Sequence, residues 1–495
     1  MAEKTVIAVD LGAESGRVMR IGFDGSRLAL TETHRFPNIP VQVGAALHWD
    51  VLRLWHDIQT GIASVKAADG SPSAGIGVDA WGVDFALLDR RGGLLANPIH
   101  YRDRSSEGMT EWVFGRIPPH DLYARTGTQI MPVNTIWRMA HLAKTGSPLL
   151  EHAQTYLTIA DLFNRWLVGA DGSADAWAAC EYTHATTTGF FNAHSRAWDA
   201  ATLDALGIPT AIFPAIVQPG ACIGAYQGVP VFTVASHDTG SAFVGVPSTG
   251  EHAAILSSGT WSLLGLEIDQ PILTEAAFHA NLTNEGGYGG TIRFLKNIAG
   301  MWLLQQCRAA WKAAVPDDKP LEYAELTALA EASAPFRTLI DPDDPAFVFP
   351  GDMPGRIRAH AGINGEPPPE TAGEFTRCIY ESLAFKYRWV LELLMQVSGR
   401  AVETIYVIGG GSRNAVLNQM TADATGRRVV AGPAEATALG CGIVQLIALG
   451  EMGSLAEARA ILAAGDEIAT YEPRHAQTAR WDAEYARFRR IIGQG

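Results

Sequence analysis

The stretch Thr5-Val-Ile-Ala-Val-Asp-Leu-Gly-Ala-Glu-Ser-Gly-Arg-Val-Met-Arg-Ile-Gly-Phe23 decides the fold of this chain. Its two apolar, β-branched runs are separated by the polar, glycine-containing segment Asp10–Gly16. This pattern predicts two antiparallel strands joined by a polar tip. The same pattern returns where Ala253–Leu256 and Trp261–Ile268 flank the tip Ser257–Thr260. One such hairpin near the start of each half of the chain indicates a duplicated fold.

Strand-like and helical runs alternate along most of the remaining chain, which is typical of an α/β protein. Val229–Ala235 and Ile405–Ile408 are candidates for buried strands, and Thr371–Val397 places apolar residues at helical spacing. By contrast, Phe336–Pro369 is rich in Pro, Gly and Asp, which predicts a surface excursion rather than core. The boundary between the two halves is expected near residues 245–252.

Composition limits the function classes that need to be considered. The chain has 495 residues, with 52 acidic and 38 basic side chains and a formal net charge of −14. This length is sufficient for two large domains. Scattered basic residues in an acidic chain argue against a nucleic-acid partner, whose phosphates attract a basic surface. No window approaches the roughly 18 apolar residues that predict a membrane span, and no membrane partner is expected.

Cysteine usage and the N-terminal sequence indicate the compartment. The five cysteines are far apart, and none forms a C-x-x-C pair: Cys180, Cys222, Cys307, Cys378 and Cys441. This spacing excludes a disulfide scaffold and a zinc ribbon. The apolar run at the N-terminus is interrupted by Asp10, which is unlike a signal peptide. We therefore expect a cytoplasmic protein.

The first polar tip has the residue types of a phosphate site. Glycines allow backbone N–H groups to turn towards an anion, and Ser15 and Arg17 add donors. Asp10 follows a buried strand, and its carboxylate is a suitable ligand for Mg²⁺. An ordinary β-turn explains the same residues when this tip is taken alone. The second tip, Ser257–Thr260, carries a similar but weaker indication.

Three further segments place polar or flexible residues at strand ends. In Ser236-His-Asp-Thr239 the carboxylate of Asp238 can accept a proton from an attacking hydroxyl, although Asp is also a common N-cap. Ile76–Asp79 and Val83–Leu88 repeat the strand–tip–strand pattern across Trp81-Gly82, where an aromatic face and Asp84 suit a sugar ring or a plain core. Gly409–Gly411 allows a flat ligand to approach, or forms a tight turn.

Taken in order along the chain, these motifs resemble those of the FGGY family of carbohydrate kinases. The matching stretches are short individually, but they extend over nearly the whole chain: Val9–Arg17, Asp79–Phe85, Tyr101–Asp103, Ala185–Thr188, Ala235–Thr239, Leu256–Ser262, Asn284–Gly287, Leu295–Ile298, Trp302–Gln305, Gly409–Gly411 and Ala431–Pro433. The region 311–375 agrees less well with the family, and its role is left unassigned.

The resemblance implies a duplicated ribonuclease-H-like α/β fold of the actin and hexokinase type, with two domains around a cleft that binds ATP. The implied parts are an N-terminal sugar-binding domain (1–248), a C-terminal nucleotide-binding domain (249–450) and a helical tail (451–495). It also implies Asp238 as the general base and Asp10 as the residue near Mg²⁺. The implied ligands of the sugar are Gly82, His237, Thr239 and Asn297. Those of ATP are Ala13, Glu14, Ser15, Gly16, Arg17, Thr260, Gln305 and Gly410.

The implied activity is ATP-dependent phosphorylation of the C1 hydroxyl of a ketose, with L-rhamnulose as the first expectation. L-fuculose and L-xylulose are alternatives, because the choice of sugar depends on a few side chains in the pocket. A different class of protein, a nucleotide-gated sugar sensor without turnover, would use the same fold. The intact Asp238 and both polar tips argue against the sensor.

Overall fold

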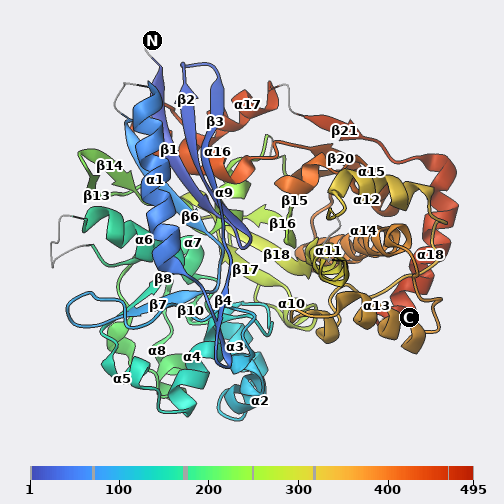
Figure 1. Ribbon diagram of the computed structural model, residues 1–495, viewed down its shortest axis with the longest axis horizontal. Coiled ribbons are helices and arrows are strands. Elements are labelled where there is room, and N and C mark those ends of the chain that lie inside the picture. The colour runs from blue at the N-terminus through green and yellow to red at the C-terminus, as the bar shows by residue number, and fades with distance from the viewer. Residues whose placement is uncertain are drawn as a thin grey trace. The chain divides into compact units, whose positions relative to one another are not determined.

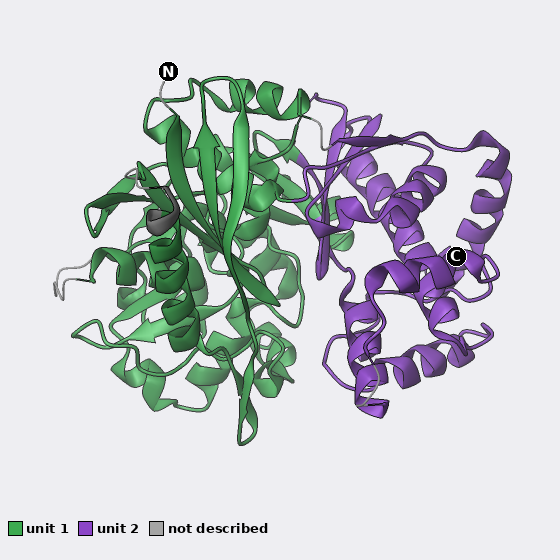
Figure 2. Ribbon diagram, turned by 45° about the horizontal axis from the view of Figure 1, so that its top comes forward, with its two compact units in different colours: residues 1–248, 267–295, 435–465 green, residues 249–266, 296–434, 466–495 purple. Residues whose placement is uncertain are grey.

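The computed structural model describes residues 3–69, 73–170, 177–247, 250–315, 319–465 and 468–493. The chain forms two compact units, and each is discontinuous in sequence (Figure 2). Unit 1 comprises residues 1–248, 267–295 and 435–465, and unit 2 comprises residues 249–266, 296–434 and 466–495. Within the described part of the chain, no helix combines the length and the apolar character needed to cross a membrane.

A six-stranded sheet lies at the centre of unit 1, in the order β13-β14-β6-β1-β2-β3 (Figure 1). Its strands are β1 (Lys4–Leu11), β2 (Ser15–Phe23), β3 (Leu28–Pro37), β6 (Gly75–Ala80), β13 (Cys222–Tyr226) and β14 (Val229–Phe232). The hairpin predicted from the first quoted stretch is confirmed, because β1 and β2 pair antiparallel with Asp10 opposite Arg17. Strand β6 runs parallel to both β1 and β14.

A second sheet repeats this arrangement, in the order β17-β18-β16-β15-β19-β20-β21. Its strands are β15 (Ala253–Ser258), β16 (Trp261–Ile268), β17 (Thr283–Gly286), β18 (Ile292–Ala299), β19 (Thr404–Ile408), β20 (Arg428–Ala431) and β21 (Ala469–Tyr471). As in the first sheet, an antiparallel hairpin is followed by two parallel strands and an antiparallel edge strand. The duplication expected from the two hairpins is therefore confirmed.

The strand–tip–strand pattern around Trp81-Gly82 does not form a third hairpin. Strand β7 (Phe85–Leu88) pairs with β8 (Thr155–Thr158) in a separate two-stranded sheet. Both edges of β6 are already occupied by β1 and β14, so no edge remains for β7. The other short strands are β4 (Val41–Val43), β5 (Ala46–His48), β9 (Cys180–Glu181), β10 (Phe191–Asn192), β11 (Ala197–Trp198) and β12 (Ile216–Val217).

Helices cover both faces of the first sheet. Gly61 of α1 faces Val18, whereas Gly442 of α16 faces Ile21 three residues further along β2, and hence on the opposite face. The helices of unit 1 are α1 (Val51–Asp69), α2 (Met109–Phe114), α3 (Pro119–Thr126), α4 (Thr135–Lys144), α5 (Pro148–His152), α6 (Ile159–Val168), α7 (Tyr182–Ala185), α8 (Ala200–Ala205), α9 (Asp238–Val244), α10 (Glu275–His279), α16 (Ala436–Ala448) and α17 (Leu455–Ala463). Those of unit 2 are α11 (Trp302–Ala314), α12 (Tyr323–Ala332), α13 (Met353–Ile363), α14 (Ala372–Ser398), α15 (Ala415–Thr425) and α18 (Thr478–Ile491).

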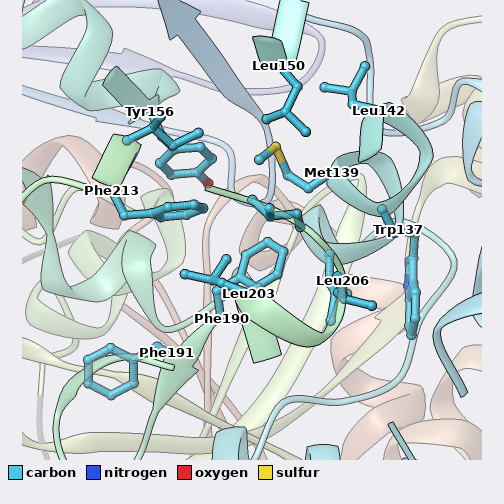
Figure 3. Close-up of a cluster of buried hydrophobic side chains, with 14 of the residues drawn as sticks. Trp137, Met139, Leu142, Leu150, Tyr156, Phe190, Phe191, Leu203, Leu206 and Phe213 are labelled. Carbon is cyan, nitrogen blue, oxygen red and sulfur yellow. The ribbon is translucent and has the colours of Figure 1, made fainter. Parts of the chain in front are cut away.

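An aromatic core anchors the short helix α7 in unit 1 (Figure 3). The rings of Tyr156 and Phe213 stack with centroids 4.7 Å apart, and Phe190 meets Phe213 edge-on. Cys180 and Tyr182, on either side of Glu181, belong to the same buried cluster. Glu181 is thus fixed in place by its neighbours in the sequence.

The prediction that Phe336–Pro369 is a surface excursion is wrong. This segment contains α13, and the side chains of Leu339, Ile340 and Met353 are fully buried. Two of its acidic residues have an internal partner. Lys386 of α14 forms ion pairs with Asp341 (2.8 Å) and Asp343 (3.0 Å), and its side chain is only 4% exposed. A polar composition indicates solvent only when the polar groups lack internal partners.

Helices α9 and α16 approach each other closely through glycine. A Cβ atom on Gly440 of α16 would lie 1.8 Å from the carbonyl oxygen of Ser241 on α9, and one on Gly245 would lie 2.2 Å from that of Ala436. Both carbonyls belong to the backbone and cannot move aside as a flexible side chain would. The two helices would therefore have to separate. The contact therefore sets the position of α9, whose first residue is Asp238.

We expect Gly440→Ala to destabilise the protein by about 1–3 kcal/mol, which is the usual cost of overpacking a buried contact. Gly362→Ala in α13 is the matched control, because a Cβ there meets no atom within 4 Å and alanine is the better helix former. The urea midpoint of unfolding should fall for Gly440→Ala and stay level or rise for Gly362→Ala. Equal midpoints for the two variants would contradict the role of this contact.

Candidate active site

The first polar tip holds its arginine between two carboxylates. Arg17 donates to Asp10 through Nε at 3.0 Å and lies 2.8 Å from the same oxygen through Nη2, and it forms a second ion pair with Glu435. Asp10 is only 3% exposed. Burial alone would lower the pKa of Arg17, but Asp10 and Glu435 together raise it. The guanidinium is therefore charged and fixed at the end of β1.

The backbone of the tip is shaped by its own hydrogen bonds. Gly12 N–H donates to the carbonyl of Ser15 at 3.0 Å, and the amide of Asn38 donates to the carbonyl of Gly12 at 2.9 Å. Glu14 is exposed, whereas Gly16 is buried against the ring of Phe36. Ala13 and Glu14 thus form the tip between β1 and β2, and Ser15, Gly16 and Arg17 begin β2, with Arg17 opposite Asp10.

Three carboxyl groups meet at the ends of neighbouring strands. Asp10 and Asp79 are direct register partners on β1 and β6, and a bridge between Ala80 and His237 brings Asp238 to the same edge. The pKa of Asp79 lies well above its usual range, first because the group is buried and then because Asp10 and Asp238 are near. Burial also raises the pKa of Asp238, with Asp10 adding to the shift and His237 opposing it.

This arrangement fits a divalent cation that arrives with a phosphate ligand. In the described part of the chain, no three His, Cys, Asp or Glu side chains lie close enough to hold a metal by themselves. Mg²⁺ is usually bound by one or two carboxylates, with waters and substrate phosphates completing the shell. A nearby positive ion favours the charged form of the buried carboxyls of Asp79 and Asp238, whose pKa values are raised. Asp10 is the candidate ligand, with Asp238 close by.

Buried polar groups on and next to α7 hold the segment that carries Asp238. The carboxylate of Glu181 accepts from the N–H of Ser236 at 3.1 Å, and Thr183 Oγ1 accepts from the N–H of His237 at 3.0 Å. His184 Nε2 donates to the carbonyl of Ser236 at 2.8 Å. Burial raises the pKa of Glu181 to about 8. The loop before α9 is therefore fixed by side chains as well as by the strand ladder.

The candidate sugar residues of unit 1 lie side by side. A Cβ atom on Gly82 would lie 2.8 Å from His237 Nε2, so the glycine leaves room for the imidazole. The same Nε2 lies 3.4 Å from Asp238 Oδ1. Asp238 Oδ1 also accepts from the N–H of Thr239 at 2.6 Å. Gly82, His237, Asp238 and Thr239 thus form one group, although they come from two distant parts of the chain.

Asp84 and Trp81 have a structural role, whereas Gly82 between them stays a candidate sugar residue. Its carboxylate accepts from the indole N–H groups of Trp49 at 2.5 Å and Trp81 at 2.8 Å, and it pairs with Arg138 at 2.8 Å. Asp84 is 1% exposed and Trp81 is 4% exposed. The polar groups of Asp84, Trp81, Trp49 and Arg138 bind one another. Asp84 and Trp81 are buried and present no face to a ligand.

Unit 2 brings three of its four predicted residues to one place. Gln305 Nε2 donates to Thr260 Oγ1 at 3.2 Å. At the end of β19, a Cβ atom on Gly411 would lie 2.1 Å from Ser258 Oγ, which places Gly410 beside the second tip. A Cβ on Gly410 itself would meet open space. The fourth residue, Asn297, lies on β18 and is half-buried.

Sequence reasoning missed four residues that contact this machinery. Asp79 and Glu285 lie within the motifs quoted for the family resemblance but were given no role, and Glu435 stands two residues after the Ala431–Pro433 motif. Arg293 had one signal, since it is a charged residue inside the apolar run Ile292–Leu295. A lone arginine in a buried strand predicts a partner that balances its charge.

Comparison with known proteins identifies the fold of this chain. Solved structures with the same fold include xylulose kinase from Lactobacillus acidophilus, with a TM-score of 0.79, 17% identity and coverage of 99% of this chain and 98% of that one. Plasmodium falciparum glycerol kinase with ADP has a TM-score of 0.75, 15% identity and coverage of 98% and 97%. These likenesses confirm the two-domain sugar-kinase fold.

Sequence comparison identifies the family to which this chain belongs. The N-terminal domain model of the FGGY family of carbohydrate kinases matches residues 5–245, and the C-terminal domain model matches residues 254–449. The chain is 42% identical to a rhamnulokinase from Bacteroides thetaiotaomicron, over 99% of this chain and 100% of the relative. It is 40% identical to one from Enterococcus faecalis, over 92% of each. This chain belongs to the FGGY family of carbohydrate kinases.

Proposed function

We propose that this kinase transfers the γ-phosphoryl group of ATP to the C1 hydroxyl of L-rhamnulose, giving L-rhamnulose 1-phosphate. The single observation that carries the choice of sugar is the level of identity, about 40% along nearly the whole length, to relatives named rhamnulokinase. The structure supports the reaction class through the carboxylate of Asp238, which lies among the candidate sugar residues.

Asp238 is the proposed general base. It takes the proton of the sugar hydroxyl while the hydroxyl oxygen bonds to the γ-phosphorus and the bond to ADP breaks. Phosphoryl transfer depends mainly on in-line positioning and on neutralising the phosphoryl oxygens. The raised pKa of Asp238 makes it a stronger base than an exposed carboxylate. Gly82, His237 and Thr239 would hold the sugar against it.

The first tip is the proposed phosphate site of unit 1. Ala13 and Glu14 form the turn, Ser15 and Gly16 begin β2, and Arg17 brings a fixed positive charge. Mg²⁺ near Asp10 would neutralise charge on the transferred phosphoryl group when bound. In unit 2, Thr260, Gln305 and Gly410 are proposed for the nucleotide and Asn297 for the sugar.

The proposed division of labour follows the two family domains. Residues 1–248 would form the sugar-binding domain and residues 249–450 the nucleotide-binding domain, with no role proposed for the tail at 451–495. Because ATP is the phosphoryl donor, we place the reaction in the cytoplasm.

Release of ADP from Mg-ATP, measured with L-rhamnulose, L-fuculose, L-xylulose, D-xylulose and glycerol in parallel, tests this proposal. We expect kcat/KM for L-rhamnulose to exceed that for every other acceptor. A preference for L-fuculose or L-xylulose would replace the substrate and keep the reaction. Nucleotide binding without turnover on any acceptor would favour the sensor.

A further inference from the structure

The imidazole of His237 lies between the proposed base and a buried arginine. Its Nε2 atom is 3.4 Å from Asp238 Oδ1, and its Nδ1 atom is 3.1 Å from Nη2 of Arg293. Arg293 lies on β18 within unit 1, where it forms hydrogen bonds with His237 and with the carbonyl of Gly286. The proposed activity gives this arginine no role.

Arg293 is held rigidly behind the histidine. Its side chain is 0% exposed, Nε donates to the carbonyl of Gly286 at 2.8 Å, and Nη1 lies 3.2 Å from Glu285 Oε2. Glu285 on β17 is its register partner across the strand pair. Two further anchors therefore fix the guanidinium plane, and the N–H of Nη2 is directed at the imidazole.

An arginine donates hydrogen bonds and accepts none. The Nδ1 atom that faces Nη2 must therefore carry a lone pair, and the ring proton must be on Nε2. The competing contact, from Nδ1 to Glu285 Oε2, is longer at 3.4 Å. A proton on Nδ1 would also face the N–H of the guanidinium at 3.1 Å, which is repulsive.

We propose that Arg293 is a positioning residue that holds His237 as the Nε2–H tautomer, so that the imidazole always presents a donor beside Asp238 and the sugar. This inference rests on the proposed role of Asp238. The N–H of Nε2 then points towards Oδ1 of Asp238. Because Nε2 already carries a proton, the proton of the sugar hydroxyl passes to Asp238 and not to the imidazole. A sugar atom that meets Nε2 must then be an acceptor, such as a hydroxyl oxygen.

The other titratable groups near His237 are His184, Glu285, Asp238 and Glu181. Burial lowers the pKa of His184 to about 3, and its ring centroid lies 5.6 Å from that of His237. His184 is therefore neutral near pH 7. The charge of Glu285 is balanced by Arg293. Asp238 Oδ1 lies 3.4 Å from Nε2 of His237. Glu181, on the α7 side, accepts from the N–H of Ser236, and because burial raises its pKa to about 8 it is mostly protonated near pH 7.

Nitrogen NMR of protein labelled with ¹⁵N-histidine tests the tautomer directly. The chain has 14 histidines, and the signal that disappears in His237→Gln identifies His237. We expect only Nε2 of His237 to be protonated near neutral pH. A proton on Nδ1, alone or with Nε2, would overturn the proposal without any variant of Arg293.

Kinetics of two Arg293 variants supply the second test. Arg293→Met keeps the length of the side chain and removes every donor, and we expect kcat to fall by about 10- to 100-fold, as when other groups that orient an imidazole are removed. KM for ATP should not change. Arg293→Lys retains a donor and should recover part of kcat and the Nε2–H signal, which a merely structural loss would not do. Glu285→Gln should keep the Nε2–H tautomer.

The outcomes separate this inference from the proposed function. If Asp238→Asn retains turnover, the assignment of the base fails, whatever the tautomer. If Asp238→Asn is inactive while folded Arg293→Met keeps both the Nε2–H signal and kcat, only the role of Arg293 fails.

Discussion

Asp238→Asn is expected to lower kcat by about 10²–10⁴-fold, the usual contribution of a general base. Asparagine has the same size and can still accept the hydrogen bond from the N–H of Thr239 at the start of α9. The fold and nucleotide binding should therefore remain. Initial rates of ADP release, together with the Kd for ATP by calorimetry, measure the two properties separately.

The matched control is Asp269→Asn, which changes an exposed aspartate in the turn after β16. Its kcat should equal that of the unchanged protein. Near-normal turnover in Asp238→Asn, or an equal loss in the control, would be incompatible with Asp238 as the base.

The acid limb of kcat against pH offers a further check on Asp238. The base must be ionised to accept a proton, so the rate should rise as the pH rises through its pKa. Because burial and Asp10 raise that pKa in the folded protein, the limb should lie at a higher pH than an ordinary aspartate of about 3.9 would give.

Arg17→Ala is the second change with a large expected effect. Removing the guanidinium takes a positive charge from the proposed phosphate site and leaves the nearby Asp10 and Glu435 without their partner. We expect kcat/KM for ATP to fall by about 10²–10³-fold, which is typical when one preorganised donor to developing charge is removed. The KM for the sugar should change much less, because the ion pairs of Arg17 are with Asp10 and Glu435 and not with a candidate sugar residue in the described part of unit 1.

Arg20→Ala is the control for Arg17→Ala. Arg20 lies on the same strand, β2, and its guanidinium contacts Glu3 at 3.1 Å and Thr5 at 3.2 Å. Such partly exposed ion pairs contribute little to stability. The kcat/KM for ATP of Arg20→Ala should therefore equal that of the unchanged protein. If both variants lose activity equally, strand β2 and not the charge of Arg17 would be responsible.

Much of the fold was predictable because it depends on local pattern. The β1–β2 and β15–β16 hairpins, the long helix α14 and the strand β19 follow from apolar periodicity interrupted by glycine and polar residues. The segment 336–369 was predicted wrongly for the same reason: its polar composition is local, but its ion pairs with Lys386 are 43 and 45 residues away in sequence.

The candidate site shows the same division. The sequence by itself determined which residue types stand at the strand ends: Asp10 and the tip up to Arg17, Gly82, and the run His237-Asp-Thr239. It also determined the family, because many short motifs keep their order along the chain. The structure adds that these residues are grouped within unit 1, whereas their roles stay predictions.

Only the tertiary structure decided which distant residues contact these site residues. Asp79 becomes a partner of Asp10 through the register of β1 with β6, and Glu435 reaches Arg17 across 418 residues of sequence. Arg293 meets His237 because β18 passes behind the loop that precedes α9. Hydrogen bonds and charge pairs act over a few ångströms in space and leave no periodic trace along the chain, so that local sequence pattern cannot encode them.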